Sequence, residues 1–225
     1  MRIAIIGTGN VGSAIAHGLK GKGHEMIIGT RDPDAAEAKQ LASETGSRSA
    51  LPADAAAMSD VIIFALPWKA AEAATKGLGD LVGKVVIDCM NPIGMVNGAL
   101  GLVVGHTSSG GEMVQTWLPE AHVVKTLNQV GAEIMAKNDH LPHRPAMLMA
   151  GNSETAKEKA AALLADLGFA PLDAGDITKS RLLEPFAMVW INQALFRGKG
   201  RNWAFAAVEG RAPLPDYHEF GNRHV

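Results

Sequence analysis

The chain has 225 residues and a mass of 23.6 kDa, which allows one large domain or one domain with a small appendage and excludes two full-sized folding units. Hydrophobic residues make up 47% of the chain and charged residues 20%, so the composition supports a folded core and excludes an intrinsically disordered protein. The 21 basic and 23 acidic residues give a formal charge of −2, which lacks the basic excess of a nucleic-acid binder.

The first three quarters of the chain alternate short apolar runs with Ala-rich stretches. The runs are continuously apolar, as in strands buried on both faces of a parallel sheet. They predict strands over 3–6, 25–28, 61–65, 84–88, 122–126, 146–150 and 169–173. Helices are expected over 10–22, 33–45, 68–76, 110–117, 131–137 and 153–167. The repeated units predict an α/β fold of the Rossmann type, with a doubly wound, mostly parallel sheet and right-handed crossovers.

Residues 178–197 are predicted to form a C-terminal helix that is apolar around much of its circumference, and Pro185 is expected to kink it unless it lies in the first turn. Such a helix needs a second packing partner, so we expect a homodimer. We therefore assign residues 1–176 to a Rossmann-like domain. Residues 177–225 are assigned to a helix and loop-like tail that serve dimerisation within one compact unit.

The first strand is followed by Gly7-Thr8-Gly9-Asn10-Val11-Gly12, which fits the dinucleotide-binding G-x-G-x-x-G pattern. The first glycine permits the turn, the second lets the backbone approach a pyrophosphate, and the third allows close packing of helix and strand. A glycine-rich turn without a ligand is the alternative, but the position between strand and helix favours dinucleotide binding.

The end of the second strand bears on the choice of cofactor. Thr30 and Arg31 offer a hydroxyl and a guanidinium to a 2′-phosphate, which favours NADP(H) over NAD. Asp32 is the competing interpretation, because an acidic residue near this position binds the ribose hydroxyls of NAD. We expect Asp32 instead to cap a helix that begins at Pro33, and Gly168 to end the helix over 153–167.

Ligands of such sheets lie at the carboxyl ends of the strands, where further candidates gather. Pro67 and Trp68 could close over the nicotinamide, with ordinary packing an equal alternative for Trp68. Asn128 could orient an amide or ribose hydroxyl, or only begin a turn. The remaining candidate cofactor contacts are Ala65, Leu66, Asn91 and Ala132.

No metal site is predicted. His140 and His143 lie in a Pro-containing loop without an evident third ligand, and solvated side chains are the simpler interpretation. Cys89 is the single cysteine, which excludes a disulfide framework and is expected to be packed. The run from Val61 to Pro67 is far shorter than the roughly 18 residues that span a bilayer. No secretory signal precedes the first strand, so we expect a cytoplasmic protein without a membrane partner.

With these motifs the chain resembles the coenzyme F-420-dependent NADP reductases, a group that includes the N-terminal reductase domains of six-transmembrane ferric metalloreductases. The resemblance covers roughly residues 1–196 and also rests on Val123-Val124-Lys125, Pro171-Leu172-Asp173-Ala174-Gly175 and Ser180-Arg181-Leu182-Leu183-Glu184. It implies that residues 8–11 hold the NADP pyrophosphate, that Thr30 and Arg31 hold the 2′-phosphate, and that the nicotinamide meets a flavin-like ring.

The expected activity is hydride transfer between NADP(H) and a small-molecule acceptor of the flavin type, such as coenzyme F-420, FMN or FAD. The cofactors carry this chemistry and the protein orients them, so no catalytic acid is required. An imine or hydroxyacid reductase is the alternative, and it would need a proton donor, for which Lys125 and His122 are the candidates. A non-enzymatic NADP(H)-binding redox sensor is a further alternative.

Overall fold

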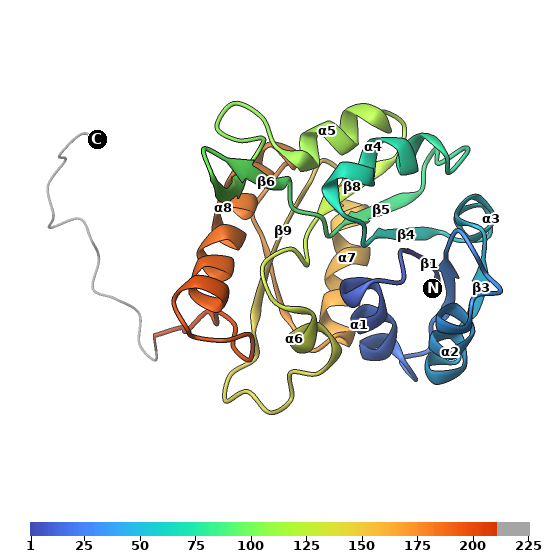
Figure 1. Cartoon of the computed structure of the whole chain (residues 1–225), viewed down its shortest axis with the longest axis horizontal. Coiled ribbons are helices and arrows are strands. Elements are labelled where there is room, and N and C mark those ends of the chain that lie inside the picture. Colours follow the sequence, from blue (N-terminus) through green and yellow to red (C-terminus); the bar gives the residue numbers. More distant parts are fainter. Residues whose placement is uncertain (211–225) are drawn as a thin grey trace, which may run out of the picture.

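The computed structural model describes residues 1–210, which form one central sheet flanked by helices (Figure 1). The eight strands are ordered β10-β9-β8-β5-β4-β1-β2-β3, and every neighbouring pair is parallel except β8 and β9. The strands are β1 (Arg2–Ile6), β2 (Glu25–Gly29), β3 (Arg48–Ala50), β4 (Val61–Phe64), β5 (Val85–Asp88), β8 (His122–Lys125), β9 (Ala146–Gly151) and β10 (Ala170–Asp173). The predicted fold class is confirmed.

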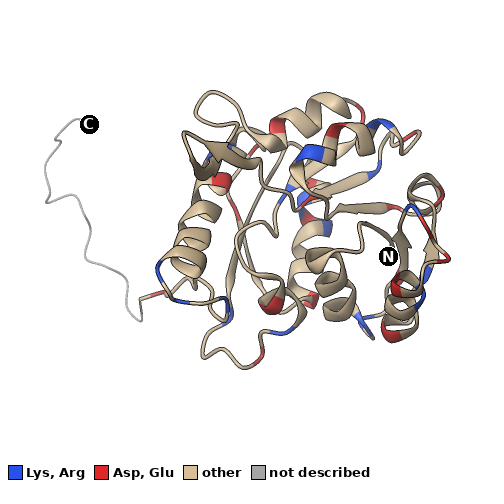
Figure 2. Ribbon diagram, viewed as in Figure 1, with Lys and Arg blue, Asp and Glu red and all other residues tan. Residues whose placement is uncertain are grey.

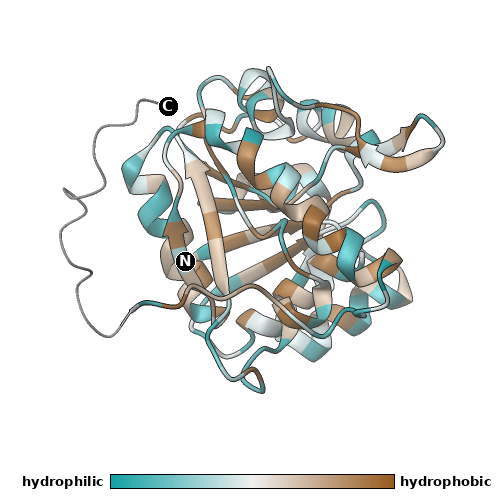
Figure 3. Ribbon diagram, turned by 90° about the vertical axis from the view of Figure 1, so that its left-hand side faces the viewer, coloured by the Kyte–Doolittle hydropathy of each residue, from teal (hydrophilic) through white to brown (hydrophobic). Residues whose placement is uncertain are grey.

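Both faces of the central part of the sheet are buried, because alternate side chains of β1, β2, β4, β5 and β8 enter two separate cores. On β1, Ile3 and Ile5 pack in one core while Ala4 and Ile6 pack in the other. Figure 3 shows the apolar strands between helices whose outer residues are hydrophilic. This double burial explains why the strands are continuously apolar in the sequence.

The helices that were predicted lie close to their expected positions, and the main difference is the start of α2. The α-helices are α1 (Asn10–Leu19), α2 (Ala36–Thr45), α3 (Pro52–Ala57), α4 (Trp68–Lys76), α5 (Gly110–Trp117), α6 (Ala132–Ala136), α7 (Glu154–Asp166) and α8 (Ser180–Ile191). The prediction that Asp32 caps a helix beginning at Pro33 is wrong, because α2 begins at Ala36. The Asp32 carboxylate accepts a hydrogen bond from the Asp34 N–H and closes a local turn. Gly168 follows α7 with φ +87°, as predicted.

The pattern of apolar runs missed four short elements, namely β3, α3 and the two strands of a hairpin. Strand β3 and helix α3 lie between α2 and β4 and are too short to give a periodic signal. A hairpin of β6 (Ile93–Val96) and β7 (Ala99–Leu102) follows the end of β5. Its turn residues Asn97 and Gly98 have φ of 50° and 82°, and this Asn-Gly pair between apolar runs is the signal that could have predicted it.

The predicted C-terminal helix is α8 followed by a π-helical segment, Asn192–Phe196, and α8 continues through Pro185. The chain then returns over it: the Trp190 indole N–H donates to the Trp203 carbonyl at 3.0 Å, and the Ala146 N–H donates to the Phe205 carbonyl at 2.9 Å. Part of the predicted tail, residues 211–225, lies outside the described residues. The division of the chain at residue 176 stays a prediction. None of the helices within residues 1–210 is long and apolar enough to cross a membrane.

Candidate cofactor site

The glycine-rich turn after β1 contains two glycines that the fold itself requires. Gly7 has φ +118°, and a Cβ there would lie 2.5 Å from the Ala65 carbonyl oxygen. A Cβ on Gly12 would lie 2.0 Å from the Gly7 carbonyl oxygen. A Cβ on Gly9, in contrast, would meet nothing within 4 Å. The turn therefore keeps open space beside its second glycine, where backbone can approach a ligand.

Helix α1 begins at this turn without a side-chain cap on its first N–H groups. Thr8, Gly9 and Asn10 are exposed, Val11 is half-buried, and the Ser13 hydroxyl donates to the Thr8 carbonyl at 3.1 Å. The free amide groups and the positive end of the helix dipole suit an anionic group such as a pyrophosphate.

Thr30 and Arg31 lie next to this turn, because the Gly7 N–H donates to the Gly29 carbonyl at 3.1 Å at the end of β2. Thr30 is half-buried and Arg31 is exposed. Within residues 1–210 Arg31 forms no ion pair, so its guanidinium is not neutralised by the neighbouring Asp32. Figure 2 shows basic and acidic residues interspersed over the helices and loops around this edge.

Hydrogen bonds beyond the strand ends align the other candidates along the same edge. The N–H groups of Ala65, Cys89 and Thr126 donate to the carbonyls of Ile6, Phe64 and Asp88, respectively. This continues the parallel ladder and brings the segments that carry Leu66, Asn91 and Asn128 into one row. Ala132, the first residue of α6, is buried in the core beside α1.

Trp68 packs against a second tryptophan, and its predicted contact with the nicotinamide stays a prediction. Its ring stacks on Trp117 of α5 with centroids 5.6 Å apart, and it is half-buried. Pro67, which precedes it, is exposed and is the residue before the first turn of α4. The stacked rings of Trp68 and Trp117 therefore pack α4 against α5.

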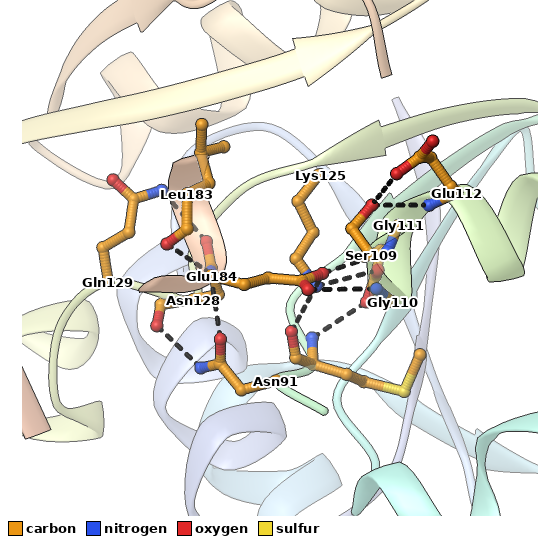
Figure 4. A network of polar contacts seen from close by, with 12 residues as sticks. Asn91, Ser109, Gly110, Gly111, Glu112, Lys125, Asn128, Gln129, Leu183 and Glu184 are labelled. Atoms are coloured by element: carbon orange, nitrogen blue, oxygen red, sulfur yellow. Dashed lines mark hydrogen bonds and ion pairs between the residues drawn. The ribbon is translucent and has the colours of Figure 1, made fainter. Parts of the chain in front are cut away.

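Asn91 and Asn128 form a reciprocal amide pair at this edge (Figure 4). The Asn128 amide donates to Asn91 Oδ1 at 3.0 Å and to the Leu183 carbonyl at 3.3 Å, and its Oδ1 accepts from Gln129 Nε2 at 3.0 Å. Both N–H groups of Asn128 are thus engaged. Asn91 uses one N–H, at 2.9 Å to the Asn128 carbonyl, and keeps a second donor. Asn91 is therefore better suited than Asn128 to contact a ligand directly.

The segment that presents Asn128 adopts an unusual backbone conformation. Leu127 has φ +60° and is almost fully buried, and it separates the end of β8 from Asn128. Such a conformation is costly for a branched residue and persists only where the surrounding structure imposes it. The sequence indicated a turn or a binding residue at Asn128, and the structure places it in a strained turn at the cofactor edge.

A buried ionic cluster lies behind the amide pair and was not predicted. Lys125 Nζ lies 3.0 Å from Asp88 and 3.1 Å from Glu184, and it also donates to the Met90 carbonyl. Burial by itself would lower the pKa of Lys125, but the charges of Asp88 and Glu184 outweigh burial and raise that pKa above its ordinary value. All three ammonium protons are used.

Neither predicted proton donor is placed to serve as one. Lys125 is fully buried and saturated, and His122 opens β8 at the opposite edge of the sheet, where its N–H donates to the Lys84 carbonyl. His122 is at a strand end, as predicted, but it is the first residue of its strand and therefore lies at the edge of the sheet away from the carboxyl ends.

Cys89 and the two loop histidines have structural surroundings. Burial raises the pKa of the Cys89 thiol far above its usual range, which suppresses thiolate chemistry. His140 Nε2 contacts Asn202 Oδ1 at 2.7 Å, and His143 is exposed. Within residues 1–210 no group of three or more His, Cys, Asp or Glu side chains is arranged to hold a metal ion.

Comparison with known proteins shows the family to which this chain belongs. Residues 2–92 match the family described as NADP oxidoreductase, coenzyme F420-dependent. A crystal structure of a protein assigned as an F420-dependent NADP reductase from Arthrobacter sp. FB24 superposes with a TM-score of 0.84 and 34% identity, covering 93% of this chain and all of that one.

Two curated relatives are more distant. The F420-dependent NADP reductase of Methanothermobacter thermautotrophicus is 29% identical over 90% of this chain and 92% of its own. The metalloreductase STEAP3 of Rattus norvegicus is 26% identical over 81% of this chain, which spans only 36% of that protein. On the family match, and on the identity shared with the Arthrobacter structure over its whole length, the chain belongs to the coenzyme F420-dependent NADP oxidoreductases and is an NADP-dependent oxidoreductase.

Proposed function

We propose that the protein transfers hydride between NADP(H) and a flavin-type acceptor at the carboxyl edge of its parallel strands. The observation that carries this is the state of the ionisable side chains behind the amide pair: Asp88, Lys125 and Glu184 are at most 1% accessible and pair with one another, so they are not available to give a proton to a substrate. Hydride transfer between two cofactor rings needs no proton donor, whereas reduction of a carbonyl or an imine does.

The residues at this edge suggest how NADP(H) would be held. The N–H groups at the start of α1 would bind the pyrophosphate, and Thr30 with Arg31 would bind the 2′-phosphate. The remaining amide donor of Asn91 is suited to a carboxamide, with Asn128 holding Asn91 in place. NADP(H) supplies the hydride chemistry when bound, and these residues orient it.

The acceptor can be identified by offering several to the pure protein. With NADPH present, absorbance at 340 nm should fall on addition of coenzyme F420, FMN or FAD, and the acceptor that gives the highest kcat/KM is the natural class. A ferric chelate is offered in parallel, because one relative is a metalloreductase. NADPH binding without turnover by any acceptor would contradict the proposal and favour a redox sensor. Turnover of an imine or ketone but of no flavin would favour the alternative enzyme.

We also propose that the protein is a homodimer formed through α8. One face of α8 is buried, and the other exposes Leu182 and Val189, which are 63% and 49% accessible and lie seven residues apart on the same side. Phe196, at the end of the π-helical segment, is 59% accessible. A hollow lined by Leu102, Val103, Leu182 and Pro185 continues this surface toward the hairpin. A two-fold pairing of identical faces would cover it.

The variant Val189→Glu should convert the dimer to a monomer. A carboxylate placed in an apolar interface should weaken association by about 100-fold or more. Sedimentation analysis at micromolar concentration measures this association. The matched control is Leu51→Glu, because Leu51 is an exposed leucine that immediately precedes α3. A wild-type protein that sediments as a monomer would refute the proposal.

A further inference from the structure

The ionic cluster behind the amide pair joins three parts of the fold at one point (Figure 4). Asp88 ends β5, Lys125 ends the neighbouring β8, and Glu184 comes from the C-terminal helix α8. The side chains of all three are at most 1% accessible. The cluster therefore connects the C-terminal helix to the edge of the sheet at which the cofactor site is proposed.

The sheet side of the cluster fixes the backbone that presents Asn91. The Asp88 carboxylate accepts from the Met90 N–H at 2.9 Å, while Lys125 donates to the Met90 carbonyl. Met90 is thus held at both of its backbone polar groups. Asn91 is the next residue, so its position follows from this arrangement.

The helix side of the cluster makes two further sets of contacts, one with the start of α5 and one with Asn128. The Glu184 carboxylate accepts from the N–H groups of Gly110 and Gly111, each at 3.0 Å, at the start of α5. The preceding carbonyl, that of Leu183, accepts from the Asn128 amide. Two adjacent residues of α8 therefore act on the position of Asn91. Glu184 pairs with Lys125, which holds Met90, and Leu183 accepts from Asn128, which bonds Asn91 directly.

Stability alone gives little reason for such a cluster. One lysine and two carboxylates leave a net negative charge in the interior, and it is offset by the N-terminal dipole of α5. Buried ion pairs of this kind are often no more stabilising than apolar side chains of the same volume, and fixing a unique arrangement is a better-attested use. The segments 123–125 and 180–184, which carry the family resemblance, meet here.

We propose that Lys125, held between Asp88 and Glu184, is a positioning residue that fixes the backbone at Met90 and Asn91. Through Glu184 it makes the nicotinamide end of the NADP(H) site depend on the C-terminal helix α8. Lys125 does not touch the cofactor; it acts through Met90 and Asn91. The adenosine end, bound by the glycine turn and Arg31, is independent of the cluster. This inference rests on the proposed NADP(H) site.

Two ligands separate the ends of the site in a binding experiment. NADPH occupies both ends, whereas 2′-phospho-ADP-ribose lacks the nicotinamide and probes only the adenosine end. In Lys125→Met the affinity for NADPH should fall about tenfold, as for one lost hydrogen bond, while the affinity for 2′-phospho-ADP-ribose stays unchanged. Titration calorimetry of the full chain measures both.

Glu184→Gln provides a second test if Lys125→Met does not fold, because it keeps the pair of Lys125 and Asp88. It should produce the same selective loss of NADPH affinity, to a smaller extent. The matched controls are Lys157→Met, which removes a buried lysine paired with Glu154 and Asp173, and Glu112→Gln, which removes the ion pair between Glu112 of α5 and Arg181 of α8. Neither control should change either affinity.

The outcomes are distinct. Equal losses for the two ligands would mean that the cluster merely supports the fold, and no loss for either would show that it does not position Asn91; both overturn the inference. A wild-type chain that binds neither ligand would instead refute the proposed function itself. A selective loss supports the inference whichever acceptor the enzyme uses.

Discussion

Replacing Arg31 by alanine should weaken NADPH binding by about 10- to 100-fold, because a hydrogen bond to a charged group contributes about 1.5–3 kcal/mol and each 1.4 kcal/mol is about tenfold in affinity. The side chain is exposed and forms no ion pair within residues 1–210, so the variant should fold normally. NADH, which lacks the 2′-phosphate, should bind the variant nearly as well as it binds the wild type. Fluorescence titration with both nucleotides measures the change in preference.

The matched control for this substitution is Arg48→Ala. Arg48 opens the neighbouring strand β3, is equally exposed, and pairs with Glu25 at 2.6 Å. It should leave the preference between NADPH and NADH unaltered, and as an exposed ion pair it should contribute little stability. If Arg31→Ala weakened the binding of NADPH and of NADH equally, the guanidinium would not be bound to the 2′-phosphate.

The second large effect is a contrast between two glycines of the same turn. Gly12→Ala should destabilise the fold by about 3 kcal/mol or more, because the new Cβ would lie 2.0 Å from backbone that cannot move without opening the turn. Gly9→Ala should change stability by less than about 0.5 kcal/mol, since φ at Gly9 is −72° and nothing lies within 4 Å of the added methyl group. Urea unfolding measures both values.

Gly9→Ala should have a large effect on ligand affinity although its effect on stability is small. The methyl group of Gly9→Ala would occupy the space where backbone approaches the pyrophosphate, so NADPH and 2′-phospho-ADP-ribose should both bind at least about tenfold more weakly to a stable protein. The matched control is Gly105→Ala, because Gly105 lies in open space away from this turn. Gly21→Ala is not suitable, because Gly21 has φ +74° and an alanine there would be strained. Unchanged affinity in Gly9→Ala would show that the pyrophosphate lies elsewhere.

The sequence by itself determined most strands of the central sheet, the fold class and the glycine-rich turn after β1. Continuous apolar runs such as Val61–Phe64 are required only of strands covered on both faces, and Gly7 and Gly12 occupy positions that no side chain can take. These properties depend on local conformation and on burial, which residue type reports directly. The hairpin turn at Asn97 and Gly98 had a local signal of the same kind.

Only the tertiary structure decided which polar residues meet. Lys125 and Glu184 are 59 positions apart, and nothing in either segment shows that one carboxylate pairs with that ammonium and also with the start of α5. The same holds for Asn128, whose amide is already engaged by Asn91 and Leu183. Hydrogen bonds between distant segments depend on how the elements pack, and packing is the sum of many weak contacts that no single motif records.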